Sequence, residues 1–278
     1  MSMNEQDRIS IQRTLESLES AENSIVLLAV ESGSRAWGFE STDSDYDVRF
    51  IYVRPPEWYL SIDLETQRDV IERPLENEID LSGWDVRKAL QLFQKSNPPL
   101  LEWLQYPIIY RERFLFAARL RELLPEFYSP RACFFHYLHM ARGNIREYLQ
   151  GEIVWRKKYF YVLRPLLAMR WIDQELGPVP IEFQKLIDAT VHDGSVRAAL
   201  EQLIAAKRSG AELDRGPRIP VISDFITSEL TRLENTASDR TDPAPQVERL
   251  NEVFRSTLKE VWQSQHGVEC ENRALNIY

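Results

Sequence analysis

A continuous apolar run at residues 25–30 constrains the fold of this chain more than any other segment. The run, Ile-Val-Leu-Leu-Ala-Val, suits a strand that is buried on both faces, and it is far too short to span a bilayer. A stretch rich in Gly, Ser and Asp follows at residues 32–44. Residues 46–53 are then rich in aromatic and β-branched side chains, which predicts a second strand. Helical periodicity over residues 5–22 precedes both strands, so the chain opens with a helix and two strands joined by a polar turn.

The segment that follows the second strand mixes strand and helix patterns. The sequence leaves the secondary structure of residues 57–76 ambiguous. Residues 77–83 place Ile79 and Leu81 on one face and acids on the other, which predicts a third strand. We expect a helix over residues 84–94, a short helix over residues 98–104 and an edge strand at residues 107–110.

From residue 113 onward the apolar periodicity is almost entirely helical. Pro165 is expected to end or kink its helix, because proline removes a donor and clashes one turn back. Residues 235–246 lack large apolar side chains and predict a flexible linker. The sequence thus predicts an N-terminal α/β domain over residues 1–112 and a helical domain over residues 113–278. The expected helices lie at residues 112–124, 130–150, 153–176, 181–190, 194–208, 222–234 and 247–264.

The charge of the chain is unevenly distributed. The whole chain carries a formal net charge of −9, which argues against a broad basic surface for nucleic acid. Residues 131–170 nevertheless carry a net charge of +6 and include Lys157 and Lys158 among aromatic side chains. This segment could line one wall of a cleft and meet a triphosphate or a nucleic-acid backbone, or it could be a salt-bridged helix that faces the acidic domain.

The cysteines and the N-terminal segment indicate the cellular compartment of the protein. Cys133 and Cys270 are the two cysteines of the chain, and no CxxC pair exists, so neither a zinc ribbon nor a disulfide framework is expected. Residues 1–23 are polar and do not resemble a signal peptide. We expect a cytoplasmic protein without a membrane partner, and the sequence leaves its oligomeric state open.

Asp45 and Asp47 are the strongest candidates for chemistry. They lie two positions apart at the start of a predicted strand, so both side chains project to one face and repel each other. A divalent cation with oxygen ligands, Mg²⁺ or Mn²⁺, is the usual partner of such a pair. Gly33 and Ser34 directly follow the buried strand, and their turn leaves backbone N–H groups free to approach phosphates. Asp80 of the predicted third strand is the best candidate for a third carboxylate.

Two arginines near these acids have more than one interpretation. Arg35 follows the Gly-Ser turn and could clamp a triphosphate, or it could pair with Glu31 or Asp43. Arg49 shares the strand face of Asp47 and could neutralise the acids or contact a substrate.

Together these motifs resemble the DNA polymerase beta superfamily of nucleotidyltransferases. That signature is an apolar strand, Gly-Ser, a spacer of about ten residues, Asp-x-Asp on the next strand and a later third acid. The matching residues are Gly33, Ser34, Asp45, Asp47 and Asp80. Longer strings resemble a bacterial family described as predicted nucleotidyltransferases of an RNA-repair pathway: GSRAWGF at 33–39, SDYDVR at 44–49, SGWDVRK at 82–88, NPPLLEW at 97–103 and KKYFYVLRP at 157–165.

The resemblance implies an α+β fold, in which a mixed sheet flanked by helices precedes a helical C-terminal domain. It implies transfer of a nucleoside monophosphate from an NTP to an acceptor hydroxyl, with Asp45, Asp47 and Asp80 holding Mg²⁺ or Mn²⁺. The nucleotide would lie against Gly33, Ser34, Arg35, Lys157 and Lys158. An RNA 3′ end is the acceptor that the family suggests. A protein hydroxyl, a small molecule, or a non-catalytic nucleotide-binding regulator are the alternatives.

Overall fold

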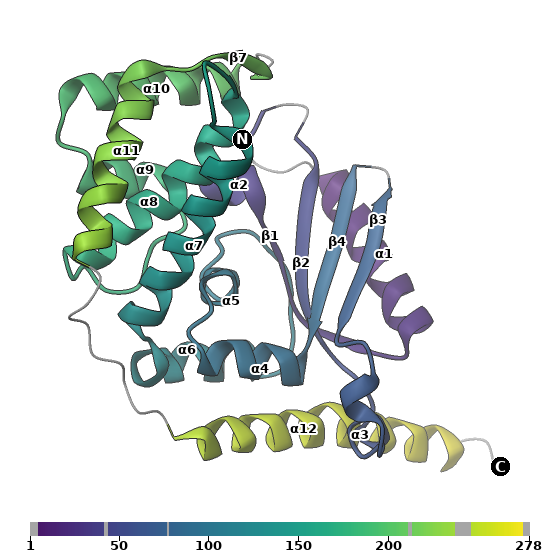
Figure 1. The fold of residues 1–278 in the computed structure, drawn as a ribbon. Helices are drawn as coiled ribbons and strands as arrows, with labels where there is room; N and C mark the ends of the chain where they lie inside the picture. Colours follow the sequence, from purple (N-terminus) through teal and green to yellow (C-terminus); the bar gives the residue numbers. More distant parts are fainter. Residues whose placement is uncertain (1–4, 42–43, 77, 211–212, 237–245, 275–278) are drawn as a thin grey trace.

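The computed structural model describes residues 5–41, 44–76, 78–210, 213–236 and 246–274. A five-stranded sheet in the order β3-β4-β2-β1-β5 stands beside a block of helices (Figure 1). β2 and β4 run parallel, while the other neighbouring strands run antiparallel, so the sheet is mixed as expected. The strands are β1 (Ile25–Glu31), β2 (Tyr46–Val53), β3 (Val70–Glu76), β4 (Ile79–Asp85) and β5 (Ile109–Glu112).

One face of the sheet is covered by α1 (Glu5–Glu22). Ile11, Leu15 and Leu18 of this helix pack with Val48 and Phe50 of β2. Successive side chains of a strand point to opposite faces, so the odd-numbered residues of β2 from Asp47 onward point away from α1. The register of β2 thus directs its polar side chains toward the helical part of the chain.

The other face packs against helices that follow the strands directly. Their shared core joins Val30 of β1 and Ile51 of β2 to apolar side chains of each helix. Asp85 ends β4 and caps the next helix, because its Oδ1 accepts a hydrogen bond from the Arg87 backbone N–H at 2.8 Å. These helices are α2 (Gly33–Trp37), α4 (Val86–Gln94), α5 (Pro98–Trp103) and α6 (Phe116–Phe127).

The remaining helices are organised around α8 (Tyr159–Asp173), most of whose residues are buried. It packs against α7, α9 and α11. The prediction for Pro165 was that it ends or kinks its helix. α8 continues through Pro165, so the proline does not end the helix, because tertiary packing on all sides outweighs the lost hydrogen bond. The neighbours are α7 (Pro130–Tyr148), α9 (Phe183–Thr190), α10 (Gly194–Arg208) and α11 (Pro220–Asn235).

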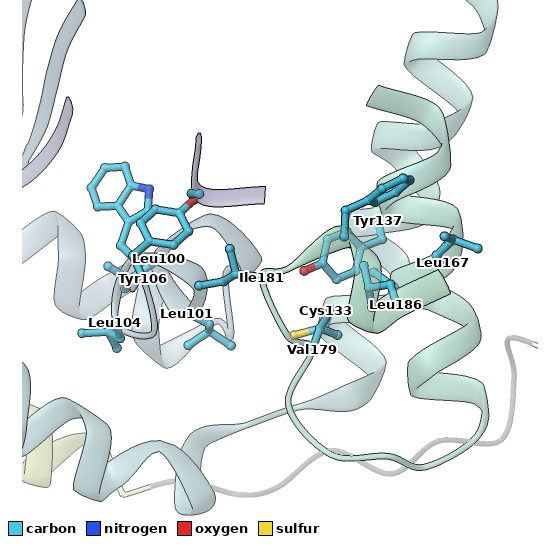
Figure 2. Packing of buried hydrophobic residues seen from close by; sticks show 14 of the residues in the cluster. Leu100, Leu101, Leu104, Tyr106, Cys133, Tyr137, Leu167, Val179, Ile181 and Leu186 are labelled. Atoms are coloured by element: carbon cyan, nitrogen blue, oxygen red, sulfur yellow. The ribbon is translucent and has the colours of Figure 1, made fainter. Parts of the chain in front are cut away.

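A single apolar cluster continues across residue 112, where the sequence predicts a domain boundary. Figure 2 shows members from both sides, including Leu100 and Leu101 of α5 and Tyr137 and Leu167 of α7 and α8. The two parts therefore share a core, and the division at residue 112 stays a prediction.

The long helix α12 (Val247–Ala274) returns to the N-terminal part of the chain and lies along α4 (Figure 1). The Phe254 ring meets the Tyr59 ring edge-on at 5.1 Å between centroids. Trp262 Nε1 donates a hydrogen bond to the Arg54 carbonyl at 3.1 Å. Tyr59 belongs to the short helix α3 (Pro56–Tyr59). Residues 237–245 of the predicted linker lie outside the described residues.

Short elements account for the remaining differences from prediction. Residues 153–155, expected to begin a helix, form β6 (Ile153–Trp155), which pairs with β7 (Arg215–Pro217). This correction has a simple cause, since the partner strand is distant in sequence and gives no local signal. The ambiguous residues 57–76 contain α3, the turn η1 (Leu64–Thr66) and β3, and the turn η2 (Arg156–Lys158) precedes α8. Among the described residues, no helix combines the length and apolar character needed to cross a membrane.

Candidate active site

Asp47 and Asp80 lie side by side on the sheet face that points away from α1. They occupy the same register position on the parallel strands β2 and β4. Arg49 Nη2 donates to Asp47 Oδ1 at 3.1 Å and to Asp80 Oδ2 at 2.8 Å. Burial raises the pKa of Asp47, Arg49 acts to lower it, and the charge of Asp80 raises it. The site is thus a pair of carboxylates that one guanidinium holds together.

Gly33 makes room for the Asp47 carboxylate. Its φ of +62° lies in the left-handed region that favours glycine. A Cβ at this position would lie 2.9 Å from Asp47 Cγ and would overlap Oδ2. The Ser32 backbone N–H donates to the Asp47 carbonyl at 2.8 Å, which fixes the turn against β2. Gly33 and Ser34, expected to form a turn, instead begin the short helix α2, and this end of the helix and the Asp47 carboxylate are packed as one unit.

Glu31 lies behind this unit and was not identified from the sequence as a site residue. Its side chain is fully buried. Its Oε1 accepts a hydrogen bond from the Asp47 backbone N–H at 3.2 Å, and its Oε2 accepts one from the Tyr110 hydroxyl. Burial raises the pKa of Glu31 to about 7, against the lowering effect of the bond from Tyr110. The sequence did contain one indication of its role, because Glu31 is an acid at the end of the otherwise apolar strand β1.

A polar cavity of about 200 Å³ opens beside Asp47. Asp45, just before β2, and Ser34 of α2 line it, and Lys157 lines it from η2 (Arg156–Lys158), just before α8. The charges of Asp45 and Lys157 act on the pKa of Asp47 in opposite directions, with Asp45 raising it and Lys157 lowering it. The polar cavity thus places acids and a lysine around one space.

A second lysine, Lys207, lines the polar cavity from the last turn of α10. Its Nζ donates to the Ser41 hydroxyl at 3.0 Å. The neighbouring Arg208 donates to the Gly38 carbonyl at 2.6 Å. Two hydrogen bonds therefore join the end of α10 to the segment that leads into Asp45 and β2. No sequence pattern pointed to Lys207, because it lies far along the chain from the residues it meets.

A second, aromatic cavity of about 270 Å³ shares two lining residues with the polar cavity. Its wall includes Arg49, and Trp37 and Tyr161 line both cavities. The rings of Trp84 and Trp103 stack at 3.9 Å between centroids, with 20° between their planes, and both line this space. Arg49 therefore connects the carboxylate pair to the wall of the aromatic cavity.

Four candidate residues are not among those that line the polar cavity: Gly33 and Asp80, which contact Asp47 and Arg49 as described above, and Arg35 and Lys158. Arg35 Nη2 donates to the Ser44 carbonyl at 2.6 Å, and its guanidinium lies over the Tyr46 ring at 4.2 Å. Its Nε lies 4.0 Å from Glu31, one of the partners considered from the sequence. The Lys158 ammonium lies over the Tyr161 ring at 4.4 Å. The structure thus brings Ser34, Asp45, Asp47 and Lys157 to one cavity and directs Arg35 and Lys158 elsewhere.

The donor set suits a hard divalent cation. No group of three or more His, Cys, Asp or Glu side chains is gathered for metal binding in the part of the chain described. Mg²⁺ commonly takes one or two carboxylates and completes its shell with water and substrate phosphates. Asp45 and Asp47, which both line the polar cavity, meet that requirement, and Gly33 leaves the space in which Asp47 Oδ2 lies.

The mixed sheet places Gly33 against a strand carboxylate and a second acid at the same register position, which are the features by which the sequence resembles the polymerase beta superfamily. A family model described as the RNA repair pathway DNA polymerase beta family, RlaP, matches residues 8–256. The chain belongs to this family.

Two known proteins illustrate the similarity. The uncharacterized protein YcgL of Bacillus subtilis (strain 168) is 48% identical over 256 residues, which are 91% of this chain and 98% of that protein. The crystal structure of a nucleotidyltransferase-like protein from Exiguobacterium sibiricum matches with a TM-score of 0.32 and 13% identity. That match covers 90% of this chain and 80% of the other.

Proposed function

We propose that this protein transfers a nucleoside monophosphate from an NTP to an acceptor hydroxyl and releases pyrophosphate. The observation that carries the proposal is the Asp47–Asp80 pair at one register position, beside a cavity that also holds Asp45, Ser34 and Lys157. Acids on one wall and a lysine on the other suit a triphosphate that arrives with divalent cations.

Each side chain then has a role. Asp45 and Asp47 would hold Mg²⁺ or Mn²⁺, which neutralises the triphosphate charge and polarises the α-phosphate. Ser34 and the turn at Gly33 contact the β- and γ-phosphates, while Lys157 and Lys207 complement their charge. Arg35 and Lys158 complete the predicted nucleotide-binding set, and we expect smaller contributions from both, because each cation lies on an aromatic ring.

Asp80 is assigned to the acceptor. The acceptor oxygen forms a new bond to the α-phosphorus as the bond to the bridging oxygen breaks, and pyrophosphate leaves with that oxygen. Asp80, next to Asp47 on the neighbouring strand, receives the hydroxyl proton. Arg49 bridges both acids and holds the Asp80 carboxylate at this position.

We propose an RNA end as the acceptor. Trp155 of β6 is exposed, and the Arg215 guanidinium lies over its ring at 5.4 Å from the centroid. Lys157, two residues after Trp155, lines the polar cavity. An aromatic ring with cations beside it suits an unpaired base and its phosphate.

The test is incubation of the full chain with each labelled NTP, Mg²⁺ or Mn²⁺, and a mixed pool of RNA and protein. We expect label in RNA, release of pyrophosphate, and loss of both in the Asp45→Asn plus Asp47→Asn double variant. Label in protein would instead support a protein-modifying transferase. Steep loss of acceptor binding with added salt would support RNA, and a salt-insensitive KM would contradict it.

A non-catalytic nucleotide-binding regulator predicts another result. Calorimetry would then show tight NTP binding while no acceptor in the pool takes label and no pyrophosphate forms. Full transfer by the double variant would contradict the assignment of the acids.

A further inference from the structure

The aromatic cavity holds buried donors that the proposed chemistry does not use. Arg164 is 3% exposed, and its Nη1 donates to Glu102 Oε1 at 2.7 Å. Its Nε and Nη2 have no hydrogen-bond partner among the described residues, and neither has the buried Trp37 Nε1. Arg164 and Trp37 both line the aromatic cavity. A buried donor without a partner is costly, so these groups indicate that a bound molecule supplies acceptors.

The charge of this compartment is already balanced. Glu102 pairs with Arg164 and also accepts a hydrogen bond from the Tyr137 hydroxyl at 2.9 Å. Arg49, the other charged side chain of the wall, pairs with the two site acids. A ligand group in the cavity therefore needs hydrogen-bond acceptors but no net charge. A phosphate is better served by the lysines of the polar cavity.

The shape favours a flat group. The stacked Trp84 and Trp103 rings contribute indole surface to the wall, and Tyr106 and Tyr161 add further rings. Aromatic walls bind flat π-systems by stacking, and arginine N–H groups pair with the ring nitrogen and carbonyl acceptors of a base. The volume of about 270 Å³ suits one such group.

We propose that the aromatic cavity is a subsite for a single nucleobase, held by the indole and tyrosine rings that line it, and that the unpaired N–H groups of Arg164 and Trp37 turn to the base when it binds. The proposal rests on the proposed function in choosing a nucleobase among flat neutral groups. The base could belong to the incoming nucleotide or to the end of the acceptor, since Arg49 connects the cavity wall to both acids.

Met140 offers a variant that closes the cavity without disturbing the core. It lines the cavity and is 38% exposed, so Met140→Trp adds bulk from the solvent side. Leu176→Trp is the matched control, because Leu176 is 44% exposed and does not line the cavity. Met140→Ala leaves the cavity open and shows whether loss of the methionine itself matters.

Calorimetry of the full chain with the four nucleosides, without divalent cation, tests the subsite. We expect saturable binding of at least one nucleoside, weakened at least tenfold by Met140→Trp and unchanged by Leu176→Trp. Met140→Ala should weaken binding less than Met140→Trp, because the smaller side chain leaves the cavity open. Inorganic tripolyphosphate should bind all four proteins alike. Equal nucleoside binding by Met140→Trp and the unmodified chain, or no nucleoside binding at all, would overturn the proposal.

Two further titrations identify the source of the base. If Met140→Trp weakens an α,β-methylene NTP analogue with Mg²⁺, the cavity holds the incoming base; if it weakens a short RNA without NTP, the cavity holds the acceptor base. A failure of the proposed function alone would look different: nucleosides would bind as expected, but no acceptor would take label. Conversely, transfer with an unchanged KM for both substrates in Met140→Trp would overturn the subsite and leave the transferase assignment intact.

Discussion

Asp47 and Asp80 lie side by side on neighbouring parallel strands, and the guanidinium of Arg49 bridges their carboxylates. The two acids nevertheless differ in their surroundings, because Asp47 lines the polar cavity and Asp80 is not among its lining residues. This difference allows their roles to be separated by experiment.

Asp80→Asn should lower the transfer rate while leaving NTP binding largely intact. We expect a rate loss of at least about 10²-fold, the scale for a group that stabilises a transition state. Asp47→Asn should lower the rate and also weaken Mg²⁺-dependent NTP binding. Steady-state kinetics and calorimetry measure the two effects, with the exposed Asp63→Asn as control. A full rate in Asp80→Asn would remove this residue from the mechanism.

Gly33→Ala should inactivate the protein by displacing the Asp47 carboxylate. Gly38→Ala is the matched control, since both glycines have positive φ but a Cβ at Gly38 meets nothing within 4 Å. Each variant should lose about 1 kcal/mol of unfolding free energy from the backbone alone. Only Gly33→Ala should also lose transfer activity. Urea unfolding and rate measurements on both variants test this, and equal activity in the two would show that the close approach does not matter.

Lys157→Met should raise the KM for NTP about tenfold, equivalent to about 1.4 kcal/mol. Lys158→Met should change it less, because the Lys158 ammonium lies over the rings of Tyr148 and Tyr161 and does not line the polar cavity. The salt dependence of the KM should also become shallower in Lys157→Met. Equal effects from the two neighbours would indicate that both contact the nucleotide.

Glu31→Gln should change how stability depends on pH. The Glu31 carboxyl has a pKa of about 7 in the folded chain and an ordinary value of 4.5, so the folded chain binds this proton more tightly. Its contribution to unfolding free energy therefore falls as pH rises from 4.5 through 7, by about 3 kcal/mol.

The Glu31→Gln variant cannot titrate at this position, so it should gain stability over the unmodified chain at pH 8 and little at pH 4.5. Urea unfolding at several pH values measures the difference, with the exposed Glu57→Gln as control. A pH profile of Glu31→Gln that runs parallel to that of the unmodified chain would show that folding does not shift the pKa of Glu31.

The elements with strong local patterns were predictable from the sequence. The strand at residues 46–53 and the helices at residues 5–22 and 194–208 have their predicted bounds, because alternation or helical periodicity is uninterrupted there. Asp80 was placed beside the Asp-x-Asp strand because its own strand alternates, and β4 confirms that neighbourhood. The roles of these residues stay predictions.

The contacts that depend on distant segments were not predictable. Lys207 contacts Ser41 across 166 positions, and β6 pairs with β7 although η2, α8, α9 and α10 lie between them in the described chain. The aromatic cavity likewise draws Trp37, Trp103 and Arg164 from separate segments. Nothing in the local pattern of any one segment carries that information.

The docking of α12 has a consequence for how the chain is made. Trp262 bonds to Arg54 across 208 positions, so the sheet segment leaves the ribosome long before its last helix is synthesised. Until then the α4 surface that α12 will cover has no partner, and contacts of such high sequence separation form slowly. A nascent chain should therefore expose apolar surface on α4 during translation, which makes this surface a site where chaperones would be needed.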